Sequence, residues 1–289
     1  MPVAEVEISE AMVRALFAEQ RPDLADRELT HIAFGWDNVS YRVGDDLVAR
    51  FPRRALAVPL ILNEARWLPE LAPSLPLPVP VPVYDGRPGA GYPWPWSLTP
   101  LIPGVSAALA SFLDLNRCAD QLGAFLVALH RPAPADAPEN RFRGMPLIER
   151  DAPTRERLEL LGDDIDRPRL ERLWEESLSA PVHRGPGVWI HGDLHPHNLL
   201  VDGGVISGVM DFGDLTSGDP ATDLAIGWSL FESHHRKRFL AAYGGGGDAT
   251  YVRARGWALS LGTAYLANSA DNPVMHAVGE RTVREVLGG

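Results

Sequence analysis

The sequence predicts an α+β protein of two lobes, a smaller β-rich lobe followed by a larger and mainly helical one. The first third holds short alternating runs of β-forming residues, separated by polar turns. From residue 115 onward the apolar residues mostly recur at helical spacing, and a single hairpin interrupts this part. A proline-rich stretch, 72–103, separates the two patterns, so we place the lobes at 1–101 and 102–289.

The β-rich lobe opens with a helix over 9–20, for which Ser9 is a suitable N-cap. Its apolar side chains share one helical face: Met12, Val13, Leu16 and Phe17. Three β-type runs then follow, with polar turns at Gly35–Asn38 and Gly44–Asp45 between them: 29–34, 39–43 and 46–51. A helix over 58–71 carries Glu64, and two more strands are expected near 79–84 and 96–101, before a crossover at 102–104.

The second lobe begins with a helix over 115–130, whose apolar residues Leu122, Phe125, Leu126 and Leu129 lie on one face. A strand at 188–190 precedes the hairpin, which turns at Asp202-Gly203-Gly204 and returns as a strand over 205–210. Asp219 and Pro220 start a further helix, with Asp219 as its N-cap. The last forty residues hold one or two helices, and the glycines 244–247 form a loop.

Composition narrows the class of protein. The formal net charge of −11 argues against general nucleic-acid binding and suits a cationic partner, although ordinary solubility explains it equally well. Cys118 is the only cysteine, which excludes an intrachain disulfide and favours a reducing cytoplasm. No apolar run approaches the length of a membrane helix and the N-terminus lacks a signal-peptide pattern, so no membrane partner is expected. We expect a monomer or weak dimer.

Three side chains between 189 and 223 predict a phosphoryl-transfer site. Asp193 follows the strand 188–190, Asn198 comes five residues later, and Asp211 ends the second strand of the hairpin. A carboxylate can orient an attacking hydroxyl, while an amide and a second carboxylate hold Mg²⁺ on the phosphates of a nucleotide. Asp193 is therefore the candidate catalytic base, and Asn198 and Asp211 are the candidate metal ligands.

The histidines around Asp193 allow a different interpretation. His191, His195 and His197 could form a zinc site with Asp193, since imidazole suits Zn²⁺. Their spacing is not that of a helical pair, and Pro196 fixes the backbone between two of the rings. We therefore expect His191 to pack within the loop and the other two histidines to flank the substrate entrance.

Other candidate binding residues are more scattered. Arg50, on the strand 46–51, could bind nucleotide phosphates in an ion pair with Glu64. The turn containing Gly35, Asn38 and Ser40 could lie over the triphosphate, although a plain hairpin turn explains it equally well. Asp214 could contact a second metal or the substrate, with a hydrogen-bonding role in its loop as the favoured alternative. Glu232 and the acidic run 154–179 could lie near the acceptor, with a solvated helix face as the favoured alternative.

The motifs HGDLHPHN (191–198), MDFGD (210–214) and GDPATDLA (218–225) together resemble those of the aminoglycoside phosphotransferase family, relatives of the eukaryotic-type protein kinases. Weaker similarity extends upstream to VARFPR (48–53) and LTPLIPG (98–104). The resemblance implies a bilobal protein-kinase-like fold in which the first lobe binds the nucleotide.

The resemblance also implies roles for individual positions. Asp193 is expected to be the catalytic residue, with Mg²⁺ on Asn198 and Asp211. Arg50 stands where many members have a lysine, and this chain has only one lysine, Lys237. The backbone of residues 98–101 is expected to read the nucleobase through Leu98, Thr99 and Leu101. Asp219 and Asp223 are expected to brace the catalytic loop.

The sequence thus predicts a Mg²⁺-dependent phosphotransferase that moves the γ-phosphate of ATP, with GTP as the alternative, to a hydroxyl of a small molecule. The expected acceptor is an aminoglycoside-like antibiotic, which is cationic; a macrolide and a small metabolite are the alternatives. A pseudokinase that binds nucleotide without turnover is the remaining alternative, because the usual lysine is missing.

Overall fold

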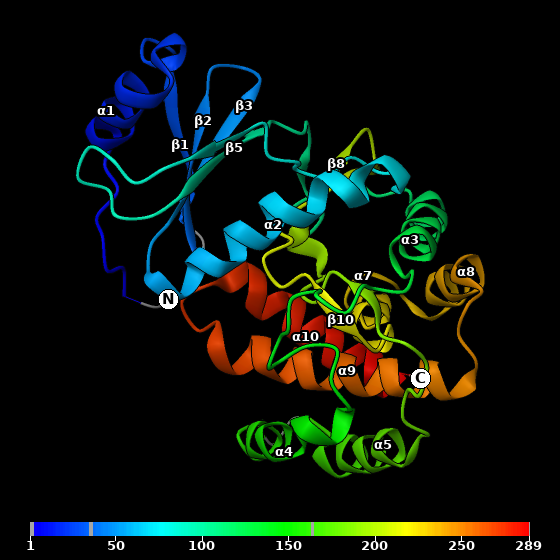
Figure 1. Cartoon of the computed structure of the whole chain (residues 1–289). Coiled ribbons are helices and arrows are strands. Elements are labelled where there is room, and N and C mark those ends of the chain that lie inside the picture. Colours follow the sequence, from blue (N-terminus) through cyan, green and yellow to red (C-terminus); the bar gives the residue numbers. More distant parts are fainter. Residues whose placement is uncertain (1–2, 35–36, 163–164, 289) are drawn as a thin grey trace. The chain divides into compact units, whose positions relative to one another are not determined.

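The structure is a computed structural model that describes residues 3–34, 37–162 and 165–288. The chain divides into two compact units, Met1–Pro73 with Pro78–Ile102, and Ser74–Leu77 with Pro103–Gly289 (Figure 1). Gly35 of the expected turn, and Asp163 and Asp164 of the acidic run, lie outside the described residues.

The first unit contains a five-stranded antiparallel sheet in the order β1-β2-β3-β5-β4. Its strands are β1 (Leu29–Phe34), β2 (Asn38–Val43), β3 (Leu47–Pro52), β4 (Tyr84–Gly86) and β5 (Trp96–Pro100). The expected strand at 79–84 is wrong except for its last residue. Pro80 and Pro82 have no N–H to donate to a ladder, and the intervening Val81 N–H donates locally to the Val79 carbonyl (2.8 Å).

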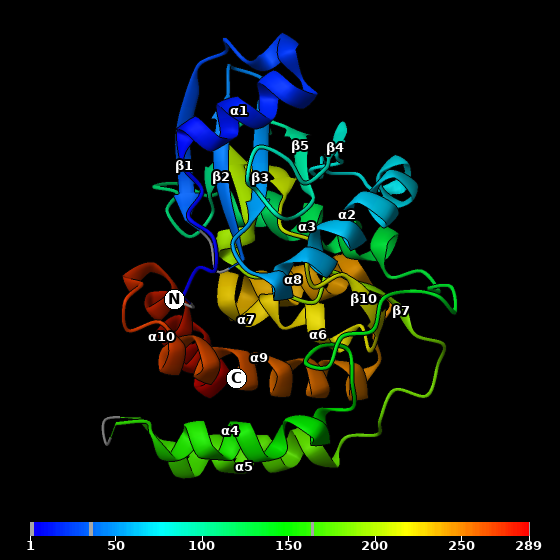
Figure 2. The same cartoon turned by 60° about the vertical axis from the view of Figure 1, so that its left-hand side comes forward.

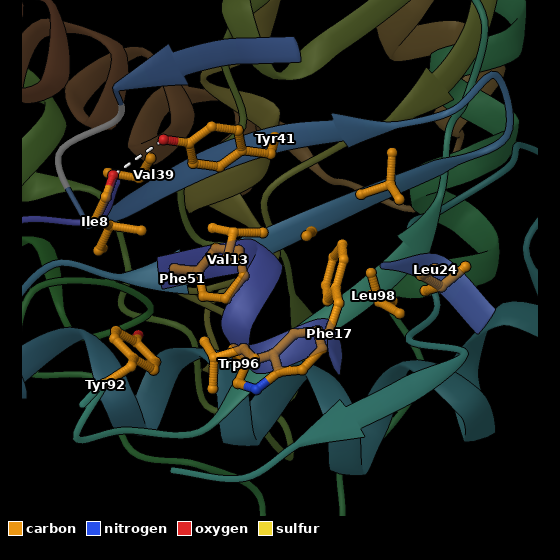
Figure 3. Packing of buried hydrophobic residues seen from close by; sticks show 13 residues of the cluster. Ile8, Val13, Phe17, Leu24, Val39, Tyr41, Phe51, Tyr92, Trp96 and Leu98 are labelled. Carbon is orange, nitrogen blue, oxygen red and sulfur yellow. Dashed lines mark hydrogen bonds between the residues drawn. The ribbon is translucent and has the colours of Figure 1, made fainter. Parts of the chain in front are cut away.

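One face of this sheet is apolar and packs beneath helix α1 (Glu10–Gln20). The Ser9 hydroxyl caps this helix by accepting from the Met12 N–H (3.3 Å), as expected. Large side chains from the helix and from β2, β3 and β5 meet in this core, where the ring of Phe51 stacks on that of Trp96 at 5.3 Å (Figure 3). The Tyr41 hydroxyl is satisfied by donating to the Ile8 carbonyl (3.0 Å).

The opposite face of the sheet is more polar. Because side chains alternate along a strand, Ser40, Arg50 and Ser97 form one row across β2, β3 and β5, on the face opposite the core. Helix α2 (Val58–Leu71) supplies Glu64 to Arg50 of this row. The helix has the bounds expected from the sequence.

The second unit is built around the long helix α9 (Asp248–Asn268), which contacts α4, α5, α6, α7 and α10. Figures 1 and 2 show α4 and α5 side by side along α9. The helices besides α9 are α3 (Leu115–Leu129), α4 (Asp151–Glu159), α5 (Arg167–Ser179), α6 (Ala221–Leu224), α7 (Ile226–Leu230), α8 (Ser233–Tyr243) and α10 (Pro273–Gly288). None of the helices in the described ranges combines the length and apolar character that a membrane crossing needs.

Two small sheets complete this unit. Strand β7 (Val188–Ile190) pairs with β10 (Thr216–Gly218), and β6 (Val105–Ser106) pairs with the hairpin of β8 (Leu199–Asp202) and β9 (Val205–Val209). The strands β6 and β10 are too short for a sequence pattern to reveal. Short 3₁₀ turns lie at Pro22–Leu24, Ala55–Ala57, Ala72–Ser74, Leu147–Arg150 and Pro196–Asn198.

Candidate active site

Asp193 lies in the loop between β7 and β8, and both of its carboxylate oxygens have partners. Arg143 Nη2 donates to Oδ1 (3.0 Å), and His195 Nε2 lies 3.4 Å from Oδ2. Burial acts to raise the pKa of Asp193, but His195 and Arg143 outweigh it and hold that pKa well below the usual range. Asp193 is therefore ionised at neutral pH, and its side chain is still 26% exposed, so an acceptor can reach it.

His191 links this loop to the end of β9. Its Nε2 must donate to the Met210 carbonyl (2.8 Å), because a carbonyl oxygen can only accept. Its Nδ1 then accepts from the Asp193 N–H (3.3 Å), which fixes the neutral tautomer. His191 thus packs within the loop, as expected.

The other two histidines have separate surroundings. His195 Nδ1 accepts from the His197 N–H (3.2 Å), so its remaining proton is on Nε2 and faces Asp193. His197 is exposed, and its Nδ1 lies 3.0 Å from the Ser106 hydroxyl. Among the described residues, the only three metal-binding side chains that converge are Glu232, His234 and His235, away from this loop in the sequence. The geometry therefore gives no support to a zinc site at Asp193.

Asn198 and Asp211 lie together at the open end of the β8–β9 hairpin. The Met210 N–H donates to the Asn198 carbonyl (2.8 Å), which brings Asp211, the next residue, beside Asn198. Asn198 Nδ2 donates to the Asp193 carbonyl (3.0 Å), and this leaves its Oδ1 for another partner. Asp211 is exposed and has a φ of +62°, a left-handed conformation that is costly for a residue other than glycine.

The buried carboxylate of Asp223 on α6 braces the loop from beneath. It accepts main-chain hydrogen bonds from His191 (2.7 Å) and Gly192 (2.9 Å), and His130 Nε2 lies 3.2 Å away. His130 in turn contacts the hydroxyl of Tyr243 at the end of α8 (3.0 Å). The resemblance thus placed this residue correctly as a brace.

Asp219 has a different role from the one expected. Its carboxylate forms a buried two-pronged ion pair with Arg253 on α9 (2.6 and 3.0 Å), so it joins α6 to α9 and not to the loop. It also accepts from the Ala221 N–H (3.1 Å). Helix α6 begins at Ala221, one residue later than expected, with Pro220 at its N-cap position, while the Asp219 carboxylate still accepts from the first turn.

Arg143 is a site residue that the sequence analysis missed. It belongs to an irregular segment, 138–144, that is hydrogen-bonded to residues 214–219. The Thr216 hydroxyl donates to the Pro138 carbonyl (2.6 Å), the Asp219 N–H to the Gly144 carbonyl (2.9 Å), and Asn140 Nδ2 to Asp214 Oδ1 (2.6 Å). These bonds hold the guanidinium against Asp193.

Asp214 lies near the same charges. Burial, together with Asp193 and Asp211, raises its pKa against the opposing effects of Arg143 and Asn140. Its bond with Asn140 is consistent with either a loop or a substrate role.

The acidic residues expected near the acceptor are mostly engaged elsewhere. Glu175 pairs with Arg155 (2.5 Å) and Glu176 with Arg255 (2.7 Å) on the exposed side of α4, α5 and α9. Glu232 is exposed at the N-cap position of α8. Glu175 and Glu176 are thus paired with arginines at the surface, and Glu232 is grouped with His234 and His235 and not with Asp193.

The first unit contains the other candidate residues. Arg50 Nη1 forms a buried ion pair with Glu64 Oε2. The hydroxyls of Ser97 and Thr99 are buried and lack a hydrogen-bond partner within the described ranges. Leu98 packs in the apolar core.

The Leu101 N–H donates to the Asp46 carbonyl (2.8 Å). In this conformation that N–H is not available to a nucleobase.

A β-rich unit followed by a helical unit, with Asp193 before the β8–β9 hairpin and Asn198 and Asp211 at its open end, is the arrangement of a protein-kinase-like α+β fold. Residues 28–257 match the phosphotransferase enzyme family, and the chain therefore belongs to that family. The predicted family is confirmed.

Among relatives, the chain is 30% identical over 159 residues to the aminoglycoside 3'-phosphotransferase of Salmonella typhimurium, across 52% of this chain. The match spans 58% of that relative, little more than half its length.

Solved structures share the fold over nearly the whole chain. The GDP and kanamycin complex of APH(2")-IIia has a TM-score of 0.73 at 20% identity, over 96% of this chain and 98% of that one. Macrolide 2'-phosphotransferase MphH from Brachybacterium faecium has a TM-score of 0.63 at 24% identity, over 95% and 98%. These similarities confirm the predicted fold class.

Proposed function

We propose that this protein is a Mg²⁺-dependent phosphotransferase that transfers the γ-phosphoryl group of ATP to a hydroxyl of a small molecule. The observation that carries the proposal is the loop geometry around Asp193. An ionised carboxylate lies on a braced loop, and its main-chain carbonyl is bonded to Asn198, which lies beside Asp211. Phosphoryl transfer depends mainly on such positioning of charge.

The side chains of Asn198 and Asp211 suit Mg²⁺. Both offer oxygen, the ligand atom that this hard cation prefers, and Mg²⁺ commonly takes one or two protein oxygens with the rest from phosphates and water. When bound, Mg²⁺ would neutralise charge on the β- and γ-phosphates. The left-handed backbone at Asp211 is consistent with a functional position, because strain of this kind gathers at such sites.

For the nucleotide we propose the polar face of the first unit. Arg50, held by Glu64, would bind phosphate oxygens as a planar fork in place of the usual lysine. Ser40 lies opposite Arg50 on the neighbouring strand. GTP is the alternative donor, since the kanamycin-bound relative was solved with GDP.

In the proposed reaction Asp193 orients the acceptor hydroxyl. The acceptor oxygen forms a bond to the γ-phosphorus while the bond to the β–γ bridging oxygen breaks, and ADP leaves with that oxygen. Asp193 accepts the hydroxyl proton late, as the new bond forms.

The names of the relatives point to aminoglycosides first and macrolides second as acceptors, with a small metabolite as the third candidate. We further propose a cytoplasmic enzyme, monomeric or weakly dimeric, that does not bind nucleic acid. The proposed location rests on the single cysteine, and the exclusion of nucleic acid on the net charge of −11.

Substitution of Asp193 tests the reaction. Asp193→Ala should abolish acceptor-dependent ADP formation and leave Mg²⁺·ATP affinity near that of the wild type. Asp202→Asn, at an exposed turn that suits Asn equally, is the matched control and should keep full turnover. Turnover of Asp193→Ala within tenfold of wild type would refute the assignment.

A pseudokinase remains the second candidate, and the arginine at position 50 is the observation in its favour. Mg²⁺-dependent ATP binding without turnover of any acceptor would support it over the proposed reaction.

A further inference from the structure

Three arginines cluster beside Asp193. Arg143 contacts Asp193 directly, and two more arginines, Arg150 and Arg157, lie within electrostatic reach of Arg143. Arg150 also lies over the ring of Phe142, the residue before Arg143, at 5.8 Å. Arg143 interacts with the carboxylates of Asp193 and Asp214, while Arg150 and Arg157 add positive charge on the other side of Arg143.

Arg157 is the clearest case of an uncompensated cation. Its side chain donates to the hydroxyls of Thr263, Thr154 and Ser260 and to the Ser260 carbonyl, all neutral groups. Burial, joined by the like charges of Arg150 and Arg143 and opposed by Glu156, lowers its pKa to about 10. Glu156 is exposed, so water screens its charge.

Two polar atoms near Asp193 also lack partners. Arg143 Nε and the Tyr265 hydroxyl are both buried without a hydrogen bond within the described part of the chain. The Tyr265 ring lies edge-on to His195 at 5.6 Å, and its hydroxyl is close enough to interact electrostatically with Asp193 and Arg143. Buried donors without partners are costly, and a bound ligand with acceptor oxygens would satisfy both.

We infer that the acceptor is an alcohol bearing an anionic group, a carboxylate or a phosphate, which Arg143 binds in place of Asp193. This deepens the proposed function and rests on it. Arg143 would exchange one carboxylate for another anion, so the exchange costs little. The same movement frees Asp193 Oδ1 for the acceptor hydroxyl.

A site that selects an anionic acceptor should disfavour a polycationic one. Ammonium groups would be repelled by Arg143 and by the two arginines near it, whereas the exposed carboxylates of α5 are paired with arginines. An acceptor with an anion a few bonds from its hydroxyl would place the anion against Arg143 and the hydroxyl against Asp193.

The test uses the full chain and pairs of acceptors that differ only in charge. A panel of hydroxy acids is compared with the corresponding amides, and phosphate monoesters of diols with the free diols, with kanamycin as the cationic acceptor. Wild type, Arg143→Gln, Arg143→Lys and the control Arg172→Gln, an exposed arginine on α5, are assayed for ADP formation.

For at least one pair, kcat/KM of the wild type should favour the anionic member by roughly tenfold or more, the effect of one charge-assisted hydrogen bond. Arg143→Gln should abolish this ratio, Arg143→Lys should retain part of it, and Arg172→Gln should leave it unchanged. The hydroxy acids and their amides test recognition of a carboxylate, and the phosphate monoesters and their diols test recognition of a phosphate. Preference for kanamycin or for the neutral members, or a ratio that Arg143→Gln does not change, would overturn the inference.

A binding measurement separates this inference from the proposed function. Calorimetry measures the affinity of inorganic phosphate with a non-hydrolysable ATP analogue and Mg²⁺ present, which fill the proposed nucleotide site. A loss of tenfold or more in Arg143→Gln, with melting temperature retained, supports the anion site even if no acceptor turns over and the proposed reaction fails. Equal affinities in the two proteins would overturn the anion site while leaving the reaction intact.

Discussion

Replacement of Asp223 should lower the stability of the folded protein more than replacement of any exposed acid. The side chain is fully buried and accepts two main-chain hydrogen bonds, from His191 and Gly192, besides its contact with His130. Asp223→Ala leaves both N–H groups buried without their acceptor, and each such loss costs about 1–3 kcal/mol. A total of about 4 kcal/mol corresponds to a fall of roughly 10 °C in melting temperature for a domain of this size.

The assay combines thermal unfolding, urea titration and steady-state turnover. Asp223→Asn keeps one acceptor oxygen and places an NH₂ group against the other donor, so it should lie between the wild type and Asp223→Ala. Asp120→Ala is the matched control: this acid also accepts two N–H bonds, from Arg238 (2.6 and 2.7 Å), but on the exposed surface. Its melting temperature should stay close to wild type, because exposed ion pairs contribute little.

Two results would refute this reasoning. One is a melting temperature for Asp223→Ala within about 2 °C of wild type, since that means less than roughly 1 kcal/mol was lost. The other is an equal fall in Asp120→Ala, since burial would then not be the cause. Retention of full turnover by Asp223→Ala would also show that the loop holds its shape without the brace.

Three further predictions concern other parts of the site. Glu64→Ala should destabilise the protein by about 3–5 kcal/mol in urea titration, because it removes one partner of a buried ion pair; a cost near zero would contradict this. Gly192→Ala should lower turnover, because its Cβ would lie 2.5 Å from the Asp214 carbonyl oxygen and its φ of +86° disfavours a side chain. The control Gly203→Ala should not lower turnover, because that residue also has a left-handed backbone but no atom lies within 4 Å of its Cβ position. Because the pKa of Asp214 is raised, the folded state holds that proton more tightly than the unfolded chain, and the contribution of this group to stability falls as pH rises from about 4 through the raised pKa. The melting temperature of Asp214→Asn should therefore rise relative to that of the wild type between pH 4 and 7. A difference in melting temperature that stays constant over this range would argue against the raised pKa.

Local patterns in the sequence predicted most of the elements. Ser9 and its following apolar residues marked helix α1, and the Asp202-Gly203-Gly204 turn marked the hairpin that carries Asn198 and Asp211. Both depend on interactions within a few residues, which a sequence displays directly. The strand expected at 79–84 failed because the apolar valines there alternate with prolines, which cannot join a ladder.

Arg143 could not be predicted in this way. Its contact with Asp193 spans fifty positions of the chain and comes from a segment without helical or strand periodicity. The sequence gives one indirect sign, Gly144, where φ is +72° and a Cβ would lie 2.9 Å from Ile190. A glycine at such a close approach shows that segment 138–144 packs tightly, but only the fold reveals which side chain this brings to Asp193.

The left-handed backbone at Asp211 has a consequence for how this chain changes under selection. Glycine or asparagine would adopt a φ of +62° at lower cost than aspartate. A library of variants selected for folding alone should therefore drift toward those residues at position 211, whereas a library selected for turnover should keep the aspartate if it binds the metal as proposed. The identity that survives at this single position thus distinguishes a chain maintained for catalysis from one maintained only for its fold.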